Sequence, residues 1–263
     1  MTKIVFILLG TAGICWAGCC TKKVCVEPEE KQVSAVDIIL QQLSQKTKQL
    51  KSYQAQVEYK VIQPDFNSTT LRKGVLYYSK SDRKSKLRAD FKTLKQDDEK
   101  EQKYREEFIF DGVWLTRINY QIKQVSMHQM AELNKPVDAF VLASRNLPIV
   151  GFARIEDLKK QFHIKLVEQD GEQAEDIHLN LKVKSDSIYK YDYVSIDFWI
   201  DKKLGLPTKV VAVSTEPEPP FGVITEIKFL KPKVNKKMDK KVFDFKIPKG
   251  FGKEIIPLKK ETK

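Results

Sequence analysis

Cysteine is absent from most of this chain of 263 residues. Its four cysteines, Cys15, Cys19, Cys20 and Cys25, all lie near the N-terminus, and none follows Cys25. The long cysteine-free part therefore has no disulfide, no thiolate metal site and no cysteine nucleophile. Cys20 and Cys25 fall in a short polar segment, where we expect no structural role for them.

Catalytic and metal-binding motifs are also missing. The chain has no G-x-S-x-G, H-E-x-x-H, G-x-x-x-x-G-K-S/T or G-x-G-x-x-G sequence. Its only histidines, His128, His163 and His178, lie in different predicted elements, and none has a second histidine or cysteine at ligand spacing. We therefore predict that the protein is not an enzyme and that it holds no metal and no cofactor.

Adjacent acidic residues do not change that prediction. Asp97-Asp98 and Glu106-Glu107 belong to a highly charged stretch, Gln96–Glu107, which we interpret as the exposed end of a hairpin. A pair of carboxylates assembled from distant strands would not be visible in the sequence.

The charge is strongly basic but is not gathered into one block. Lysine and arginine number 47 against 35 acidic residues, for a net charge of +12, and the two signs are interspersed. This distribution is typical of a solvated surface, although a basic surface also suits an anionic membrane or an acidic ligand. Nucleic acid is not expected as a partner, because the N-terminus predicts export.

The first residues, MTKIVFILLGTAGICWAGCC, have the pattern of a secretory signal. Lys3 precedes an apolar run, residues 4–17, that is too short to span a bilayer as a helix. The pair Gly18-Cys19 is typical of a lipoprotein signal, in which residues 1–18 are removed and Cys19 receives the lipid. Cleavage after Ala17 or Gly18 without lipidation is the alternative. In both cases we expect an exported, periplasmic protein.

The rest of the chain predicts one domain. Residues 19–33 form a polar tether, and residues 34–51 have the apolar spacing of an amphipathic helix with Ser34 as its N-cap. Apolar and polar residues then alternate with a period of two, as half-buried strands do. Strands are predicted at 53–61, 71–79, 86–91, 108–110, 113–119, 124–127, 164–168, 177–183, 193–201, 208–215 and 223–230. A further helix is predicted at 155–162.

This pattern predicts a mainly β (α+β) fold. We expect a curved antiparallel sheet, or unclosed β-barrel, covered by a few helices around a hydrophobic cavity. Large apolar side chains on the predicted strands are the candidates for lining the cavity on one side of the sheet, and an ordinary core is the alternative for each of them. They are Tyr77, Phe108, Phe110, Trp114, Leu115, Val194, Ile196, Phe198 and Ile200.

Short motifs in a fixed order extend this prediction. They are Leu50-Lys51-Ser52-Tyr53-Gln54-Ala55, Gly74-Val75-Leu76-Tyr77, Leu87-Arg88, Phe110-Asp111-Gly112-Val113-Trp114-Leu115 with Tyr120-Gln121-Ile122-Lys123-Gln124-Val125, Phe198-Trp199-Ile200-Asp201 with Leu206-Pro207, and Phe243–Gly250. With them the chain resembles the LolA/LolB superfamily of periplasmic lipoprotein and lipid carriers over residues 36–248.

The resemblance implies an unclosed barrel that shelters acyl chains, with acylated lipoproteins or lipids as partners and a role in outer-membrane lipoprotein sorting. It implies that Arg88 holds a lid closed, with a surface arginine as the alternative, and that Phe243–Gly250 is the closing strand. Residues 34–250 would be the lipid-binding domain and residues 251–263 a basic tail. A monomer is expected. The alternative function is an envelope-stress sensor that binds a lipid or a partner and transports nothing.

Overall fold

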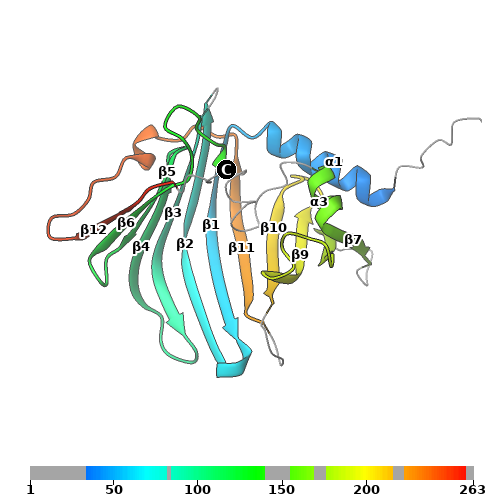
Figure 1. The fold of residues 1–263 in the computed structure, drawn as a ribbon, viewed down its shortest axis with the longest axis horizontal. Helices are drawn as coiled ribbons and strands as arrows, with labels where there is room; N and C mark the ends of the chain where they lie inside the picture. Colours follow the sequence, from blue (N-terminus) through cyan, green and yellow to red (C-terminus); the bar gives the residue numbers. More distant parts are fainter. Residues whose placement is uncertain (1–33, 82–83, 140–154, 169–175, 216–221, 259–263) are drawn as a thin grey trace, which may run out of the picture. The chain divides into compact units, whose positions relative to one another are not determined.

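One twelve-stranded sheet organises the fold (Figure 1). The computed structural model describes residues 34–81, 84–139, 155–168, 176–215 and 222–258. Across the sheet the strands are β12 (Gly252–Ile256), β6 (Gln124–Gln129), β5 (Trp114–Asn119), β4 (Gln102–Phe110), β3 (Lys84–Gln96), β2 (Ser68–Ser81), β1 (Ser52–Gln63), β11 (Ile224–Val234), β10 (Pro207–Ser214), β9 (Tyr193–Asp201), β8 (Asp176–Val183) and β7 (Phe162–Val167).

The sheet consists of two antiparallel meanders. Strands β1 to β6 follow one another in chain order, as do β7 to β11, and the two series meet where β1 pairs with β11. Strand β12 pairs in parallel with β6. Strands β12 and β7 are the two edges, so the sheet does not close on itself. The predicted mainly β fold with an unclosed curved sheet is confirmed.

The described residues contain two α-helices, α1 (Ala35–Lys48) and α3 (Ile155–Gln161). As predicted, Ser34 caps α1: its Oγ accepts a hydrogen bond from the backbone N–H of Asp37 at 3.2 Å. Leu40 and Leu43 of α1 are buried, and both helices contact β7. No helix in the described ranges has the length and apolarity needed to cross a membrane.

The main hydrophobic cluster defines one face of the sheet, which we call the core face. It gathers alternate residues of the strands with Leu40 and Leu43 of α1. Among its members are Ala55 and Val57 of β1 and Leu179, Phe198 and Val210 of β8 to β10. Facing residues of antiparallel neighbours point to the same side, so the strand register assigns every other strand residue to the core face or to the opposite back face.

The back face has its own smaller cluster, over β4 to β6. Ile109, Ile118 and Val125 are buried there against Phe245 and Phe251 of the chain that leads into β12. This chain begins with the 3-10 helix η2 (Lys240–Phe243). We call residues 240–251 the C-terminal segment. The main cluster thus takes buried residues from β1 to β4 and from β7 to β11, whereas β4 to β6 bury residues on the back face.

The end of the chain differs from the sequence prediction. The closing strand is not at Phe243–Gly250, which is η2 followed by irregular chain, but at Gly252–Ile256 within the predicted tail. Aromatic residues in this stretch alternate as strand residues do, but Phe245 packs on the back face instead of entering a ladder.

The predicted exposed hairpin end at Gln96–Glu107 is confirmed for residues 96–103, which are exposed, but is wrong for Glu106 and Glu107. Strand β3 extends to Gln96, β4 begins at Gln102, and only the turn between them lies outside the sheet. Glu106 and Glu107 are 0% and 4% exposed, because arginines from neighbouring strands pair with both carboxylates.

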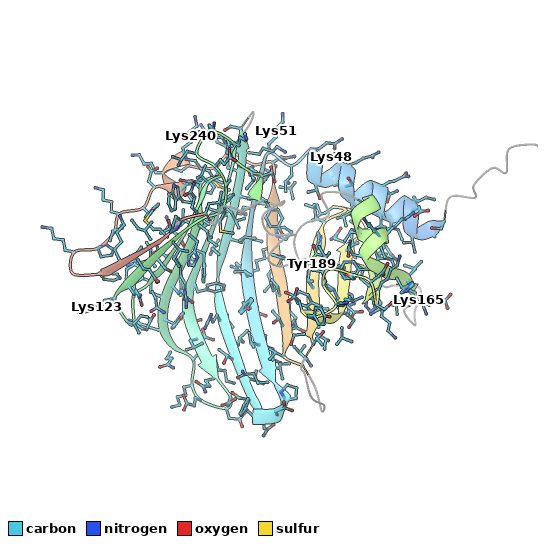
Figure 2. All side chains as sticks on the ribbon, in the orientation of Figure 1. Lys48, Lys51, Lys123, Lys165, Tyr189 and Lys240 are labelled. Atoms are coloured by element: carbon cyan, nitrogen blue, oxygen red, sulfur yellow. The ribbon has the colours of Figure 1, made fainter. Side chains whose placement is uncertain are left out.

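Basic residues are spread over the surface. The lysines labelled in Figure 2, Lys48, Lys51, Lys123, Lys165 and Lys240, are all exposed and come from four separate parts of the chain. The positive charge of the described residues therefore forms no single block, as their spacing in the sequence predicts.

Candidate functional site

The structure divides the nine predicted cavity residues between the two faces of the sheet. Those on the core face are Phe108, Phe110, Leu115, Ile196, Phe198 and Ile200. Phe110, Ile196, Phe198 and Ile200 are at most 2% exposed and belong to the core. Val194 is not on the core face with them: the register between β9 and β10 shifts beside it, Tyr193 pairs with Ser214 and packs on the main cluster, and Val194 is 48% exposed. Phe108 and Leu115 are half-buried against the main cluster.

Tyr77 and Trp114 lie on the back face, which corrects the prediction that all nine residues point to one side. Tyr78, next to Tyr77, is the buried residue, and it pairs with Tyr53 of β1 on the core face. Trp114 precedes Leu115, which pairs with Phe110. A step of one residue along a strand reverses the direction of the side chain, so the faces follow from these partners.

A row of aromatic rings runs across the core face of β1, β3 and β4. The ring centroids of Tyr59 and Phe91 are 6.1 Å apart, and those of Phe91 and Phe108 are 6.2 Å apart with the rings nearly perpendicular. Tyr59 and Phe108 are half-buried and Phe91 is 8% exposed. We call these three residues the aromatic row. Tyr59 and Phe108, which are only partly buried, can contact a further apolar group, whereas Phe91 belongs to the core.

A buried carboxylate lies beside the aromatic row on the same face. Glu106 Oε1 accepts a hydrogen bond from Arg117 Nε at 2.6 Å, and Glu106 Oε2 accepts one from the Tyr104 hydroxyl at 2.8 Å. Arg72 Nη1 lies 3.4 Å from Oε2 as an ion pair. Burial raises the pKa of Tyr104, and the hydrogen bond to Glu106 is the second largest cause of this rise. The hydroxyl therefore stays protonated and serves as a donor.

Both arginines also contact aromatic rings. The guanidinium carbon of Arg117 is 5.7 Å from the centroid of Phe108, and that of Arg72 is 5.3 Å from the centroid of Tyr104. These distances are in the range of cation–π contacts. The arrangement joins an apolar surface to two cations on one face of the sheet.

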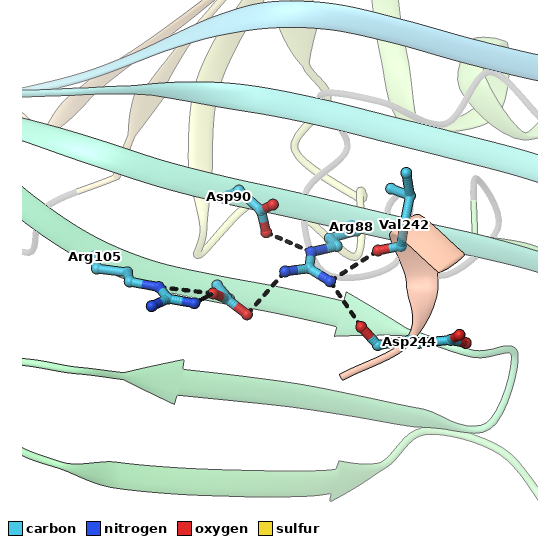
Figure 3. A network of polar contacts seen from close by, with 6 residues as sticks. Arg88, Asp90, Arg105, Val242 and Asp244 are labelled. Carbon is cyan, nitrogen blue, oxygen red and sulfur yellow. Dashed lines mark hydrogen bonds and ion pairs between the residues drawn. The ribbon is translucent and has the colours of Figure 1, made fainter. Parts of the chain in front are cut away.

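Arg88, the predicted lid-holding residue, lies on the back face and binds the C-terminal segment (Figure 3). Its Nη1 donates to the carbonyl oxygens of Val242 at 2.8 Å and Asp244 at 3.1 Å. Its Nε donates to Asp90 at 2.6 Å and its Nη2 to Glu107 at 3.0 Å. Arg88 thus fastens a covering segment to the sheet, on the side away from the aromatic row.

The buried acids around Arg88 differ in their surroundings. Burial is the largest cause of a raised pKa at Asp90, and the hydrogen bond from Arg88 opposes it. Glu107 also accepts two hydrogen bonds from Arg105, which is 62% exposed. Every donor nitrogen of Arg88 faces a carboxylate or a carbonyl oxygen, as a structural network requires.

Sequence reasoning did not find Arg72, Glu106 or Arg117. Glu106 was assigned to solvent, and its partners lie on β2 and β5, which the sequence does not bring together. Arg72 lies in LRKG before an apolar run, where it reads as a surface residue. Within the described residues no group of three His, Cys, Asp or Glu is placed to hold a metal ion.

Comparison with known protein families finds no match, and no curated protein matches the sequence. Among solved structures, an uncharacterized conserved protein from Thermus thermophilus is 12% identical, with 86% of this chain and 100% of that chain covered and a TM-score of 0.47. MucB of Pseudomonas aeruginosa, solved with MucA, is 14% identical, with a TM-score of 0.45. This chain covers 60% of that chain, and the match takes in 80% of this chain.

A LolA superfamily protein from Nitrosomonas europaea also matches, at 13% identity and a TM-score of 0.33, over 78% of this chain and 95% of that one. A protein of the superfamily that the sequence motifs resemble is therefore among the solved structures to which this chain is similar.

Proposed function

We propose that this protein is an exported carrier or acceptor that binds the acyl chains of lipoproteins or lipids on the core face of its sheet, in outer-membrane lipoprotein sorting. The observation that supports this most directly is the aromatic row on an unclosed sheet. Tyr59 and Phe108 keep part of their ring surface exposed, while the described helices contact β7 at the sheet edge remote from β12.

The physical argument concerns the cost of moving an acyl chain through water. Each methylene group gains about 0.8 kcal/mol when it is buried in an apolar environment. A chain carried between membranes therefore needs an apolar surface, and the partly exposed Tyr59 and Phe108 of the aromatic row supply part of one. A protein without a nucleophile, base or metal motif can perform this task because no covalent bond changes.

The N-terminus supports the location of this function. The apolar run at residues 4–17 predicts export, and Cys19 followed by a tether of residues 20–33 would hold the domain close to a membrane. A lipid-anchored protein of this kind suits the role of an acceptor.

Native mass spectrometry of the mature protein tests the proposal. The protein is purified gently, then incubated with phospholipid and with an acylated peptide, and bound species are weighed. We expect acyl species to remain bound to the natural protein. Phe108→Gln is expected to lower their bound fraction at least fivefold, because it removes an apolar contact on the core face.

Trp114→Gln is the matched control. Trp114 is half-buried like Phe108 but lies on the back face of the next strand. The Trp114→Gln variant should bind acyl species as the natural protein does. Circular dichroism verifies that both variants are folded. A natural protein that stays empty after both incubations contradicts the carrier function and favours a sensor that binds a protein partner.

A further inference from the structure

We propose that Arg72 and Arg117 form a binding site for the phosphate group of an anionic lipid, beside the aromatic row. This inference rests on the proposed function and adds the class of headgroup. It starts from an unsatisfied donor: Arg72 Nε is buried, and no acceptor among the described residues lies within hydrogen-bonding range of it.

Arg72 has unusually few partners for an arginine on the core face. Its side chain is 29% exposed, and its described contacts are the ion pair with Glu106 at 3.4 Å and the contact with the Tyr104 ring. A guanidinium has five N–H donors arranged as a planar fork, and it pairs best with an oxyanion that accepts two of them. A phosphate oxygen provides that type of acceptor.

The charges leave room for an anion. Two guanidiniums face the single carboxylate of Glu106, so the cluster has an excess positive charge of one. The Glu106 oxygens are already occupied by the Arg117 Nε and the Tyr104 hydroxyl, at 2.6 and 2.8 Å. Arg117 is 47% exposed, which leaves donors on its outer side available to a ligand.

Arg72 and Arg117 lie beside the aromatic row, as the headgroup of a lipid lies beside its acyl chain. Arg117 contacts the ring of Phe108, the last member of the aromatic row, at 5.7 Å. A lipid whose chain lies along the row would therefore have its headgroup within reach of both cations. Ser126 pairs with Arg117 across β5 and β6 and adds a hydroxyl on the same face.

Other charged groups nearby point away from this site. Lys73, the next residue after Arg72, pairs with Glu101 at 2.8 Å on the opposite face. Glu107, Arg105 and Arg88 also lie on the back face. These back-face residues therefore do not compete with Arg72 and Arg117 for the anion or for Glu106.

The test compares two lipids with the same acyl chains in native mass spectrometry of the full mature protein. Dioleoyl phosphatidylglycerol has a phosphate and dioleoylglycerol has none. We expect the natural protein to prefer the phospholipid at least tenfold. Arg72→Gln should reduce the preference to less than threefold, while Lys73→Gln, which removes a cation from the opposite face of the same strand, should leave it unchanged.

Glu106→Gln distinguishes a binding role from a structural one. It keeps the shape of the side chain but removes the competing negative charge, so it should increase the preference for the phospholipid by a fewfold. A purely structural cluster would lose binding in this variant. A preference unchanged in both Arg72→Gln and Glu106→Gln overturns the phosphate site but leaves the carrier function in place.

Competition with inorganic phosphate separates two sources of the same chemistry. If millimolar phosphate displaces the phospholipid, the site recognises phosphate in general. If it does not, the site requires the whole lipid headgroup and chain. Both results support the proposal, whereas binding of neither lipid to the natural protein overturns the carrier function and the phosphate site with it.

Discussion

Glu106 and Glu107 are consecutive residues that point to opposite faces of β4, and both are buried. Each is surrounded by arginine donors, because a buried carboxylate without partners would be protonated or would destabilise the fold. The partners Arg72, Arg88 and Arg117 come from three other strands. No local sequence pattern links an acid to partners so far away, which explains why solvent exposure is the natural prediction for this pair.

Replacing Arg88 with glutamine should destabilise the protein in a pH-dependent way. It leaves Asp90 and Glu107 without a buried partner and should lower the free energy of unfolding by roughly 2 to 4 kcal/mol at pH 7. Burial already raises the pKa of Asp90, and loss of Arg88 raises it further. A carboxyl with a raised pKa in the folded state loses stability as pH rises through that pKa, so the deficit should be larger at pH 7 than at pH 4.

Urea unfolding at the two pH values measures this effect. Arg105→Gln serves as the control, since Arg105 binds the same Glu107 but is 62% exposed, and it should cost less than about 1 kcal/mol. An Arg88→Gln deficit that is the same at pH 4 and pH 7 would contradict the assigned coupling to Asp90.

At the scale of elements, alternation in the sequence predicts strands well. Eleven predicted strands correspond to β1 through β11, and the range 193–201 matches β9 residue for residue. The face of each strand is less predictable, since it depends on the partner: Tyr77 and Trp114 alternate regularly but lie on the back face. Strand β12 escapes prediction because its residues are mostly exposed and short of apolar side chains.

Phe251 anchors the C-terminal segment, and its removal should loosen β12. Its ring is 5.4 Å from that of Tyr120, in an edge-to-face contact on the back-face cluster. Phe251→Ala should lower the free energy of unfolding by roughly 1 to 3 kcal/mol, less than for a fully buried phenylalanine. It should also speed hydrogen exchange of amides in β6 and β12, measured by mass spectrometry.

Ile255→Ala tests whether any truncation in this segment has the same effect. Ile255 lies in β12 but is 54% exposed, so its change should stay within about 0.5 kcal/mol. Equal effects of the two substitutions would mean that strand pairing, rather than the packing of Phe251, holds the segment.

At the scale of the whole molecule, the sequence predicts the class of fold more surely than the position of the site. The alternation and the LolA/LolB motifs lead to the unclosed sheet that the structure has. The aromatic row and the arginine cluster arise only when β1 to β5 are side by side. Their members are distant in sequence, so their proximity is a property of the register and not of any motif.

Membrane attachment through Cys19 is a prediction for the intact protein. Produced with its own leader in a Gram-negative host, the natural protein should fractionate with membranes, and its N-terminal peptide should begin at Cys19 with acyl mass added. Cys19→Ser should release the protein into the periplasmic fraction. The Cys20→Ser variant, as the control, should remain attached to the membrane. An unmodified N-terminus in the natural protein would instead support cleavage without lipidation.

The pairing of β1 with β11 has a consequence for folding. Within each meander, neighbouring strands are also neighbours in sequence, so each can form from short loops. Among the strand pairs of the described residues, only the seam of β1 and β11, from Tyr53 and Val234 to Ile62 and Ile224, joins residues more than half the chain apart. Closing such a long loop costs the most chain entropy, so we expect the seam to form last and to limit the folding rate.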